Sequence, residues 1–388
     1  MKHSLDEGVL TLWLAGRIDS VNSPETEREI NNLLGDTAAV VLDCEQLEYI
    51  SSAGLRILLR TAKAVPCIKL VNVHPEVYDI FEMTGFTEMM EIHRAYRVIS
   101  LDGCELIGQG ANGRVYRIDR ETVVKAYIHS NALADIQKER ELARTAFVLG
   151  VPTAIPYDVV RIAGGGYGSV FELLNATNFS KLLLRGEKTV DEIVKMSVDL
   201  LKIIHATEVK PSSMPSMKEI ALGWADFLSD YLPEKQARKL HTLIAAVEED
   251  NHMIHGDFHI KNITRQGDEN LILDMDTLAH GHAVFEFASM FNAYIGFYVS
   301  NQTSRHFLGI DYETGVEIWN KSLRMYFEGA DEAAIRAYEE KAMILGYARL
   351  LRRRIRRGGF ETKEGRREIA CCQAVLAELL PRVDSLTF

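Results

Sequence analysis

The stretch MIHGDFHIKNI, residues 253–263, sets polar side chains among apolar ones. Asp257 follows His255 by two residues and precedes Asn262 by five. Burying a carboxylate or an amide costs free energy unless the group finds a partner. Because apolar residues surround both groups, we predict that Asp257 and Asn262 lie in a loop that serves chemistry.

The residues that follow this loop predict a β-hairpin. Its polar turn, QGDEN at 266–270, has a midpoint near residue 268. A hairpin centred there would place Asn262 opposite Asp274, so that an amide oxygen and a carboxylate converge. Hard oxygen ligands of this kind suit Mg²⁺. Asp276, two residues further on, either joins the metal site or faces solvent.

A glycine-rich stretch, GQGANGRV at 108–115, precedes the loop by more than a hundred residues. Gly108, Gly110 and Gly113 have the GxGxxG spacing, and the stretch lies between two predicted strands. This context favours a hairpin that covers nucleotide phosphates over a dinucleotide-binding turn, which would lead into a helix. Glycines allow backbone N–H groups to approach phosphate oxygens closely. The alternative is a merely flexible hairpin.

Lys125 stands in the middle of the apolar strand VVKAY. A lysine at such a position is costly to bury unless its ammonium is paired. A nucleotide phosphate and the carboxylate of Glu139, in the helix that follows, would pair it. Glu141 is the competing partner, although it falls on a different face of that helix.

The order of these groups along the chain is that of the kinase signature set: a glycine loop, Lys, Glu, an Asp five residues before an Asn, and a further Asp. The chain therefore resembles the aminoglycoside phosphotransferase and choline kinase-like family. The distinguishing mark is His255-Gly256-Asp257 with a second histidine, His259, two residues after the Asp. The resemblance covers about residues 101–388 and is strongest up to residue 290.

The resemblance implies a two-lobed protein-kinase-like fold, with a β-rich N-lobe at 101–174 and a helical C-lobe at 175–388. It implies ATP, or another nucleoside triphosphate, with Mg²⁺ as cofactors. The residue roles that it implies are a catalytic base at Asp257, metal ligands at Asn262 and Asp274, a phosphate-binding Lys125 oriented by Glu139, and a hinge strand, with Glu172 and Leu174, against which the adenine lies. Relatives often carry an Asp where this chain has Glu286.

The first hundred residues alternate strand and helix signals. They predict a domain at 1–100 that forms a small α/β sandwich. The expected strands are 8–14, 38–44, 67–73 and 89–93, and the expected helices are 24–34, 53–63 and 75–85.

Residues 5–98, with LAGRIDSVNSPETEREI and YISSAGLRILL among them, resemble the STAS domain, the fold of bacterial anti-sigma-factor antagonists. In that family a serine at the start of a helix can be phosphorylated, and alignment on Gly54 makes it Ser52. The preceding residue is Asp in the switch members and Ser51 here. A serine at a helix N-terminus is either a cap or a favourable site for phosphate, and both interpretations stay open for Ser52.

Composition narrows the class of protein. The chain has 388 residues and a formal net charge of −11, which disfavours nucleic-acid binding. No long apolar run predicts a membrane span, and AVFEFASMFNAYIGFYV at 283–299 is expected to be a buried helix. Five cysteines without metal-type spacing and the lack of a secretory signal predict a cytoplasmic protein with free thiols.

A basic run, ARLLRRRIRRGG at 348–359, interrupts the acidic chain. Six arginines lie between residues 349 and 357. They are either the solvated face of a helix whose Leu350, Leu351 and Ile355 pack inward, or part of an anion site.

Together these features predict a phosphotransferase that acts on a small-molecule hydroxyl and carries the STAS domain as a regulatory or partner-binding module. One alternative is a protein-directed kinase that modifies Ser52 in its own or another copy. Another is a nucleotide-binding adaptor without turnover. The acceptor, the choice between ATP and GTP, and the oligomeric state are not predicted.

Overall fold

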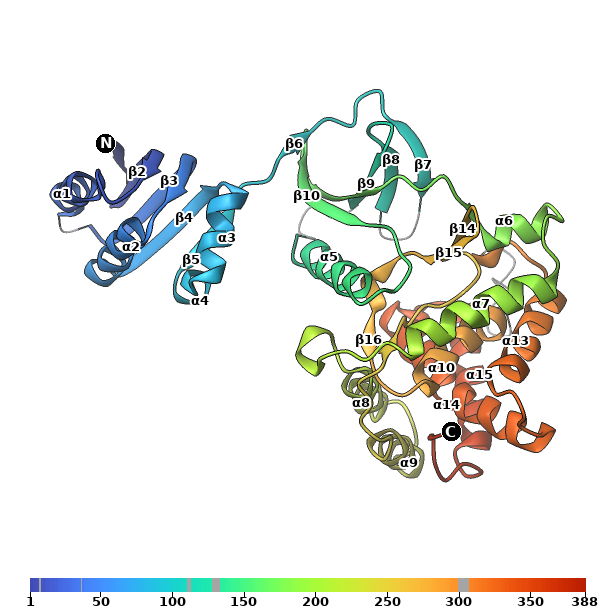
Figure 1. Ribbon diagram of the computed structural model, residues 1–388. Coiled ribbons are helices and arrows are strands. Elements are labelled where there is room, and N and C mark those ends of the chain that lie inside the picture. The colour runs from blue at the N-terminus through green and yellow to red at the C-terminus, as the bar shows by residue number, and fades with distance from the viewer. Residues whose placement is uncertain (7, 36, 110–112, 128–132, 299–306) are drawn as a thin grey trace. The chain divides into compact units, whose positions relative to one another are not determined.

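The computed structural model describes residues 1–388 except 7, 36, 110–112, 128–132 and 299–306 (Figure 1). The chain divides into two compact units. One is Met1–Asp102 with Val159–Gly166, and the other is Gly103–Asp158 with Tyr167–Phe388. Each unit is described by itself.

The first unit is built on a five-stranded sheet in the order β1-β2-β3-β4-β5. Strand β1 pairs antiparallel with β2, and the remaining pairs are parallel, as expected for strands joined by helices. The predicted α/β fold is confirmed, although strand β1 was not expected. The elements are β1 Lys2–Asp6, β2 Val9–Ile18, α1 Ser23–Leu34, β3 Ala39–Ile50, α2 Ser52–Ala64, β4 Cys67–Val73, α3 Pro75–Met83, α4 Phe86–Met89 and β5 Glu91–Arg94.

Helix α2 approaches the ends of two strands at Gly54. A Cβ atom at this position would lie 2.6 Å from Ile50 Cγ1 and 2.9 Å from Ile18 Cγ2. Real Cβ atoms do not come so close to their neighbours, so only glycine fits without a shift of the packing. The sequence therefore needs glycine here for packing.

A six-stranded sheet, in the order β6-β10-β11-β9-β8-β7, precedes the helical part of the chain. Strands β7, β8, β9 and β11 form an antiparallel series. The residues are β6 Val98–Ile99, β7 Glu105–Gln109, β8 Gly113–Arg117, β9 Thr122–Tyr127, α5 Leu133–Val148, β10 Pro156–Ile162 and β11 Tyr167–Glu172.

The rest of the second unit is mainly helical, and Figure 1 shows α7, α10 and α13–α15 gathered in one bundle. Its helices are α6 Phe179–Leu184, α7 Val190–His205, α8 Met217–Leu228, α9 Glu234–Ala245, α10 Val284–Phe291, α13 Tyr312–Tyr326, α14 Glu332–Arg356 and α15 Lys363–Leu379, with a π-helical turn η3 Asn292–Gly296 and short 3₁₀ turns η1 Pro211–Ser213, η2 Met275–Thr277 and η4 Gly359–Glu361. The unit also contains two small sheets, which are formed by the short strands β12 Thr177–Asn178, β14 Ile263–Gln266 and β15 Glu269–Ile272, and by β13 Met253–Ile254 and β16 Ala279–His280.

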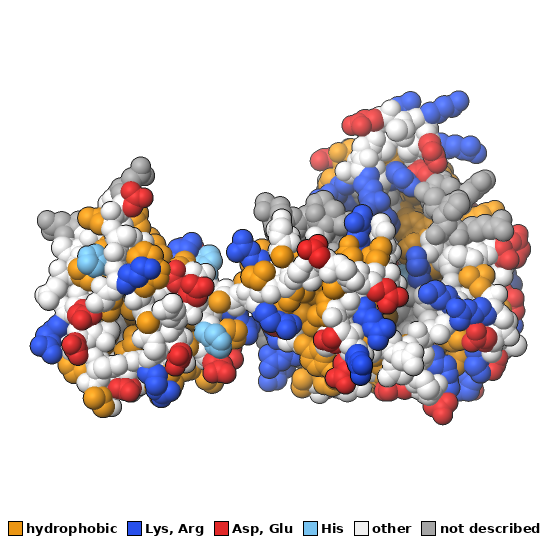
Figure 2. Space-filling model, turned by 90° about the horizontal axis from the view of Figure 1, so that it is seen from above, with side chains coloured by type: hydrophobic (Ala, Val, Ile, Leu, Met, Phe, Trp, Pro, Cys, Tyr) orange, Lys and Arg blue, Asp and Glu red, His pale blue; other side chains and the backbone are white. Residues whose placement is uncertain are grey.

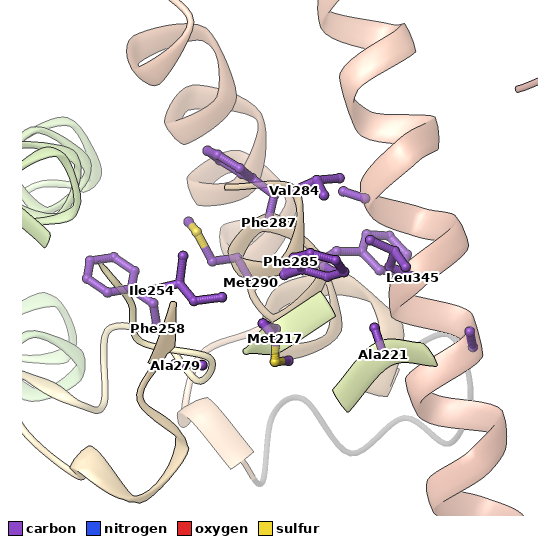
Figure 3. Close-up of a cluster of buried hydrophobic side chains, with 14 of the residues drawn as sticks. Met217, Ala221, Ile254, Phe258, Ala279, Val284, Phe285, Phe287, Met290 and Leu345 are labelled. Atoms are coloured by element: carbon purple, nitrogen blue, oxygen red, sulfur yellow. The ribbon is translucent and has the colours of Figure 1, made fainter. Parts of the chain in front are cut away.

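The core of this unit surrounds α10, whose eight residues are all buried. Figure 3 shows Phe285, Phe287 and Met290 of α10 among side chains from α8, α14, β13 and the loop after β13, including Met217, Ala221, Leu345, Ile254 and Phe258. The apolar run at 283–299 thus begins as the buried helix that was predicted. Among the described residues, no helix is both long and apolar enough to cross a membrane.

The surface mixes charges of both signs. Figure 2 shows Lys and Arg interspersed with Asp and Glu on the face in view, in keeping with a chain whose excess of acid is moderate.

Candidate active site

Lys125 of β9 joins two carboxylates that lie far apart in the sequence. Its Nζ donates to Glu139 Oε1 and to Asp274 Oδ1, each at 2.7 Å. The lysine side chain is 16% exposed and that of Glu139 only 5%. Glu141, the alternative partner, instead faces Arg140 and Arg144 on the exposed side of α5. The pair expected from the sequence is therefore Lys125 with Glu139.

Burial alone would lower the pKa of Lys125, but the two carboxylates outweigh it and raise that pKa above its ordinary value. Tyr127 donates its phenolic hydrogen to the other oxygen of Glu139. Burial raises the pKa of Tyr127, so the phenol stays a donor. Glu139 is thus fixed from two sides and holds the ammonium in one place.

Asp257 follows the short strand β13 and is held by its neighbours in the loop. His259 Nε2 lies 3.5 Å from Asp257 Oδ2, and Asn262 Nδ2 donates to the Asp257 carbonyl oxygen at 3.0 Å and to Oδ2 at 3.4 Å. Burial opposes ionisation, but the Nε2–H of His259, which faces the carboxylate, and the charge of Arg349 hold the pKa of Asp257 well below its usual range. Its side chain is 38% exposed, so an ionised carboxylate remains accessible.

Two histidines orient the loop through their ring nitrogens. His255 Nε2 donates to the Leu273 carbonyl at 3.1 Å, and its Nδ1 accepts from the Asp257 N–H at 3.3 Å. His259 Nδ1 accepts from the Asn262 N–H at 3.3 Å, which leaves the proton on Nε2, toward Asp257. Both rings are almost fully buried. The histidines that marked the family resemblance therefore position the loop.

Glu286, fully buried in α10, anchors the turn before Asp257. Its carboxylate accepts from the backbone N–H groups of His255 and Gly256 and from the hydroxyl of Ser289. Burial raises the pKa of Glu286, but the nearby His205, whose Nε2 lies 3.8 Å from Oε2, and the hydrogen bond from the His255 N–H outweigh it and leave the pKa lowered. The residue that departs from the family pattern is thus a structural anchor of the loop.

Gly256 itself has φ +77°, a left-handed backbone that favours glycine. A Cβ there would lie 2.7 Å from the Thr277 carbonyl oxygen. On the other side, Arg349 Nη1 of α14 donates to the Gly256 carbonyl at 2.9 Å. The loop is therefore held through its backbone as well as its side chains.

The predicted hairpin exists, but its register differs by one residue. Ile263 pairs with Ile272 and Gln266 with Glu269, and the Leu273 N–H donates to the Asn262 carbonyl at 2.8 Å. Asn262 therefore lies opposite Leu273, and the expected pairing with Asp274 was wrong. Gly267, with φ +59°, and Asp268 are the two central turn residues, as in a type II′ turn, so the centre lies between them.

Asp274 and Asp276 bring two carboxylates to the end of this hairpin. Asp274 has φ +66°, unusual for a residue other than glycine. Burial and the charge of Asp274 raise the pKa of Asp276 to about 7. Asp276 thus does not simply face solvent. Two carboxylates that repel each other and the amide oxygen of Asn262 are oxygen donors of the kind that fits Mg²⁺. In the described part of the chain, no three His, Cys, Asp or Glu side chains form a complete metal cage.

The glycine stretch is only partly described. Gly110 lies outside the described residues. Gly108 pairs with Val115, and a Cβ at Gly113 would lie 2.5 Å from the Ala126 carbonyl oxygen. Gly113 is therefore required by the close approach of β8 and β9. The phosphate-binding roles of these glycines stay predictions.

The expected hinge lies at the end of β11. Glu172 is the last residue of that strand, and its Oε2 accepts from the Ile155 N–H at 3.2 Å. Leu174 follows outside the strand, partly buried. Their contact with adenine stays a prediction.

In the first unit, the capping interpretation of Ser52 was wrong. Ser51 is the N-cap of α2, and its side chain accepts from the Gly54 N–H at 3.4 Å. Ser52 is the first helical residue and is exposed. The hydroxyl that stabilises the helix is thus the preceding one.

The basic run forms the end of α14, with Leu350, Leu351 and Ile355 buried as expected. Arg349 was missed as a residue of the site, and Glu286 was noted only as a departure from the family pattern. Both act on backbone atoms far away in the sequence, and residue spacing carries no signal of such contacts. A buried glutamate within an otherwise apolar helix was the one available clue.

The model that describes the phosphotransferase enzyme family matches residues 103–307, more than half of the chain. The chain belongs to this family. The model of the STAS domain matches residues 4–98. This chain is 34% identical over 99 residues to BtrV of Bordetella bronchiseptica strain RB50, which is named as an anti-sigma factor antagonist. The match covers 24% of this chain and 85% of the relative.

Solved structures similar to this family member include aminoglycoside phosphotransferase APH(4)-Ia. Its thermostable mutant with ADP and hygromycin B has a TM-score of 0.51 and 12% identity, covering 78% of this chain and 97% of that one. A complex with AMP-PNP and hygromycin B gives a TM-score of 0.50 and 13% identity over 72% and 93% of the two chains. At these identities the likeness shows the fold, and it confirms the predicted kinase-like fold class.

Proposed function

We propose that the chain transfers the γ-phosphoryl group of ATP to a hydroxyl group of a small molecule. The observation that carries the proposal is the contact of one buried ammonium, that of Lys125, with both Glu139 and Asp274 at 2.7 Å. It joins strand β9 to the end of the hairpin that follows Asp257. Membership of the phosphotransferase family supports the reaction type.

The proposed roles follow from the contacts. Lys125 would exchange its contact with Asp274 for the α- and β-phosphates while Glu139 keeps it in place. Asn262, Asp274 and Asp276 would hold Mg²⁺. When bound, the metal neutralises the charge of the β- and γ-phosphates. Nucleotide-bound relatives of the same fold support ATP as the donor.

Asp257 would act on the acceptor. The bond between the γ-phosphorus and the bridging oxygen breaks, a bond to the acceptor oxygen forms, and the hydroxyl proton passes to Asp257. ADP leaves with the electron pair of the broken bond. The low pKa of Asp257 keeps the carboxylate ionised, and His259 and Asn262 aim it. Such an Asp works mainly by orienting the hydroxyl.

The STAS domain would be a regulatory or partner-binding module. Its resemblance to a protein named as an anti-sigma factor antagonist supports binding of a protein partner. The phosphotransferase chemistry does not depend on this part of the proposal.

The decisive experiment compares Asp257→Asn with the control Asp268→Asn, whose side chain is fully exposed in the hairpin turn. Purified hydroxyl compounds are incubated with protein, Mg²⁺ and labelled ATP, and nucleotide affinity is measured separately. We expect Asp257→Asn to lose about a thousandfold in transfer and to keep its nucleotide affinity. Full transfer by Asp257→Asn contradicts the proposal. Nucleotide binding without transfer in the wild type favours the adaptor alternative.

A second candidate function is phosphorylation of Ser52 in the same or another copy of the chain. The observation in its favour is that Ser52 is exposed and that Ser51 makes the capping bond. Intact mass after incubation with MgATP tests it on the wild type, Ser52→Ala and Ser51→Ala. An added phosphate that only Ser52→Ala abolishes supports this function, and an unchanged wild-type mass excludes it.

A further inference from the structure

The last turns of α14 present arginines on one side of the helix. Arg349, Arg352, Arg353 and Arg356 follow the spacing i, i+3, i+4 and i+7, which places them on one face. Among the described residues, none of the four has a carboxylate at ion-pair distance, whereas Arg354 pairs with Glu368. The segment 299–306 contains no Asp or Glu. Four positive charges thus lie together without an ion-paired carboxylate among the described residues of an acidic chain.

Aromatic rings hold three of these guanidinium groups in place. Arg349 lies over Trp224 at 5.7 Å, Arg352 over Phe227 at 5.8 Å and Arg353 over Phe297 at 4.9 Å, measured to the ring centroids. A guanidinium over a ring face is attracted by the ring quadrupole and keeps its hydrogen-bonding edge available. The cluster is therefore ordered.

The arginine cluster contacts the loop that carries Asp257, residues 255–262. Arg349 donates to the Gly256 carbonyl, one residue before Asp257. A second connection runs through rings: His259, which faces Asp257, packs on Phe307 at 4.9 Å, and Phe307 packs on Phe297 at 5.4 Å, beneath Arg353. Arg353 thus belongs to the surroundings of the base that would receive the acceptor proton.

The electrostatics agree with this placement. Burial and the charges of Arg357, Arg349 and Arg354 lower the pKa of Arg353, and the charge of Asp257 opposes the shift. Burial, with Arg356 and Arg349, lowers the pKa of Arg352. Like charges held together repel one another, and an anion bound among them would relieve that repulsion.

We infer that the hydroxyl acceptor carries an anionic group, a carboxylate or a phosphate, and that Arg353 binds this group while the hydroxyl faces Asp257. The inference rests on the proposed phosphotransferase function and specifies its substrate class. A guanidinium matches the two oxygens of either anion in a bidentate contact. A cationic acceptor would instead meet unfavourable charge.

The test separates small molecules from a cell extract into anionic, neutral and cationic pools at pH 7. The full-length protein, Mg²⁺ and ATP labelled at the γ-phosphate are added to each pool. We expect labelled product in the anionic pool. Treating that pool with a phosphatase beforehand distinguishes the sources: a lost signal identifies a phosphate ester, and a retained signal identifies a carboxylate. Product only in the neutral or cationic pool overturns the inference and leaves the proposed function standing, whereas no product in any pool contradicts both.

A matched pair of variants tests the arginine itself. Arg353→Gln is expected to raise KM for the anionic acceptor about tenfold or more and to leave KM for ATP unchanged. Arg336→Gln removes the same charge from the exposed start of α14, roughly 25 Å away along the helix axis, and is expected to change neither constant. An unchanged acceptor KM in Arg353→Gln contradicts the assignment, provided that the variant retains the wild-type unfolding temperature and KM for ATP.

Discussion

Two turns at the ends of strands, one in each unit, solve the same problem with different groups. Residues 255–257 follow β13 and residues 51–54 follow β3. In both, a side-chain oxygen accepts from backbone N–H groups, and a glycine stands where a Cβ would collide with neighbours. In the turn after β13 the oxygen belongs to the fully buried carboxylate of Glu286. In the turn after β3 it belongs to the partly buried hydroxyl of Ser51.

The difference indicates which of the two turns is held more rigidly in its conformation. A buried carboxylate that accepts several hydrogen bonds is strongly held, because the loss of any partner leaves a charge or an N–H group unsatisfied. This suits a loop that must keep Asp257 in a fixed position. The hydroxyl contact is weaker, and the exposed Ser52 beside it remains accessible to other molecules.

The largest expected effect comes from Glu286→Ala. The change leaves the N–H groups of His255 and Gly256 without their acceptor and should lower the free energy of unfolding by about 3 to 5 kcal/mol. Glu328→Ala, at an exposed position, should change it by less than about 0.5 kcal/mol. Calorimetric unfolding of the two variants measures the difference, and equal effects would remove the anchor role.

Gly256→Ala comes next. The left-handed backbone and the clash with the Thr277 carbonyl should together cost about 2 to 4 kcal/mol and displace Asp257, so that transfer is lost as well. Gly267→Ala is the matched control, because Gly267 also has a positive φ but no atom within 4 Å of the added Cβ. It should cost about 1 to 2 kcal/mol and spare transfer. Denaturant unfolding measures the loss of stability, and transfer assays measure the loss of activity. Equal losses of both in the two variants would contradict the expected role of Gly256.

The charged anchor should also make the second unit sensitive to acid. The pKa of Glu286 is lowered on folding from an ordinary value of 4.5, so its stabilisation is present above pH 4.5 and is lost as pH falls through the folded-state pKa. One such group changes stability by at most about 1.4 kcal/mol per pH unit. Unfolding between pH 3 and 6 should show a shallower pH dependence in Glu286→Gln than in the wild type, and no change of slope in Ser51→Ala. Parallel curves for Glu286→Gln and the wild type would argue against a depressed pKa.

The smallest effect belongs to the serine turn. Ser51→Ala removes the cap of α2 and should cost about 0.5 to 2 kcal/mol, whereas Ser52→Ala should change stability by less than about 0.5 kcal/mol. Hydrogen exchange of the α2 amides in the full chain measures both. Faster exchange in Ser52→Ala than in Ser51→Ala would reverse the assignment of the cap.

The sequence predicted the contacts that depend on residue type at a fixed spacing. Lys125 within an apolar strand required a carboxylate, and the helical position of Glu139 made it the better partner than Glu141. The hairpin was found from its polar turn, but its register depended on which residue takes the positive φ. Gly267 takes it, so the turn is centred between residues 267 and 268 and not on residue 268.

Other features depend on tertiary contacts that spacing does not encode. Glu286 reaches the N–H groups of His255 and Gly256 across about 30 residues, and Arg349 reaches the Gly256 carbonyl across 93. The cap of α2 depended on where the helix begins, and a difference of one residue moved it from Ser52 to Ser51. Helix ends are the least certain part of any reading of sequence.

The contact of Lys125 with both Glu139 and Asp274 has a consequence for the order in which ligands bind. Lys125 acts as an internal counter-ion for Asp274, so that carboxylate is neutralised before any ligand arrives. Lys125 competes with a divalent ion for the charge of Asp274, and phosphate oxygens are the groups that would draw the ammonium away. We therefore expect the site to bind Mg²⁺ weakly in the absence of a nucleotide and much more tightly in its presence.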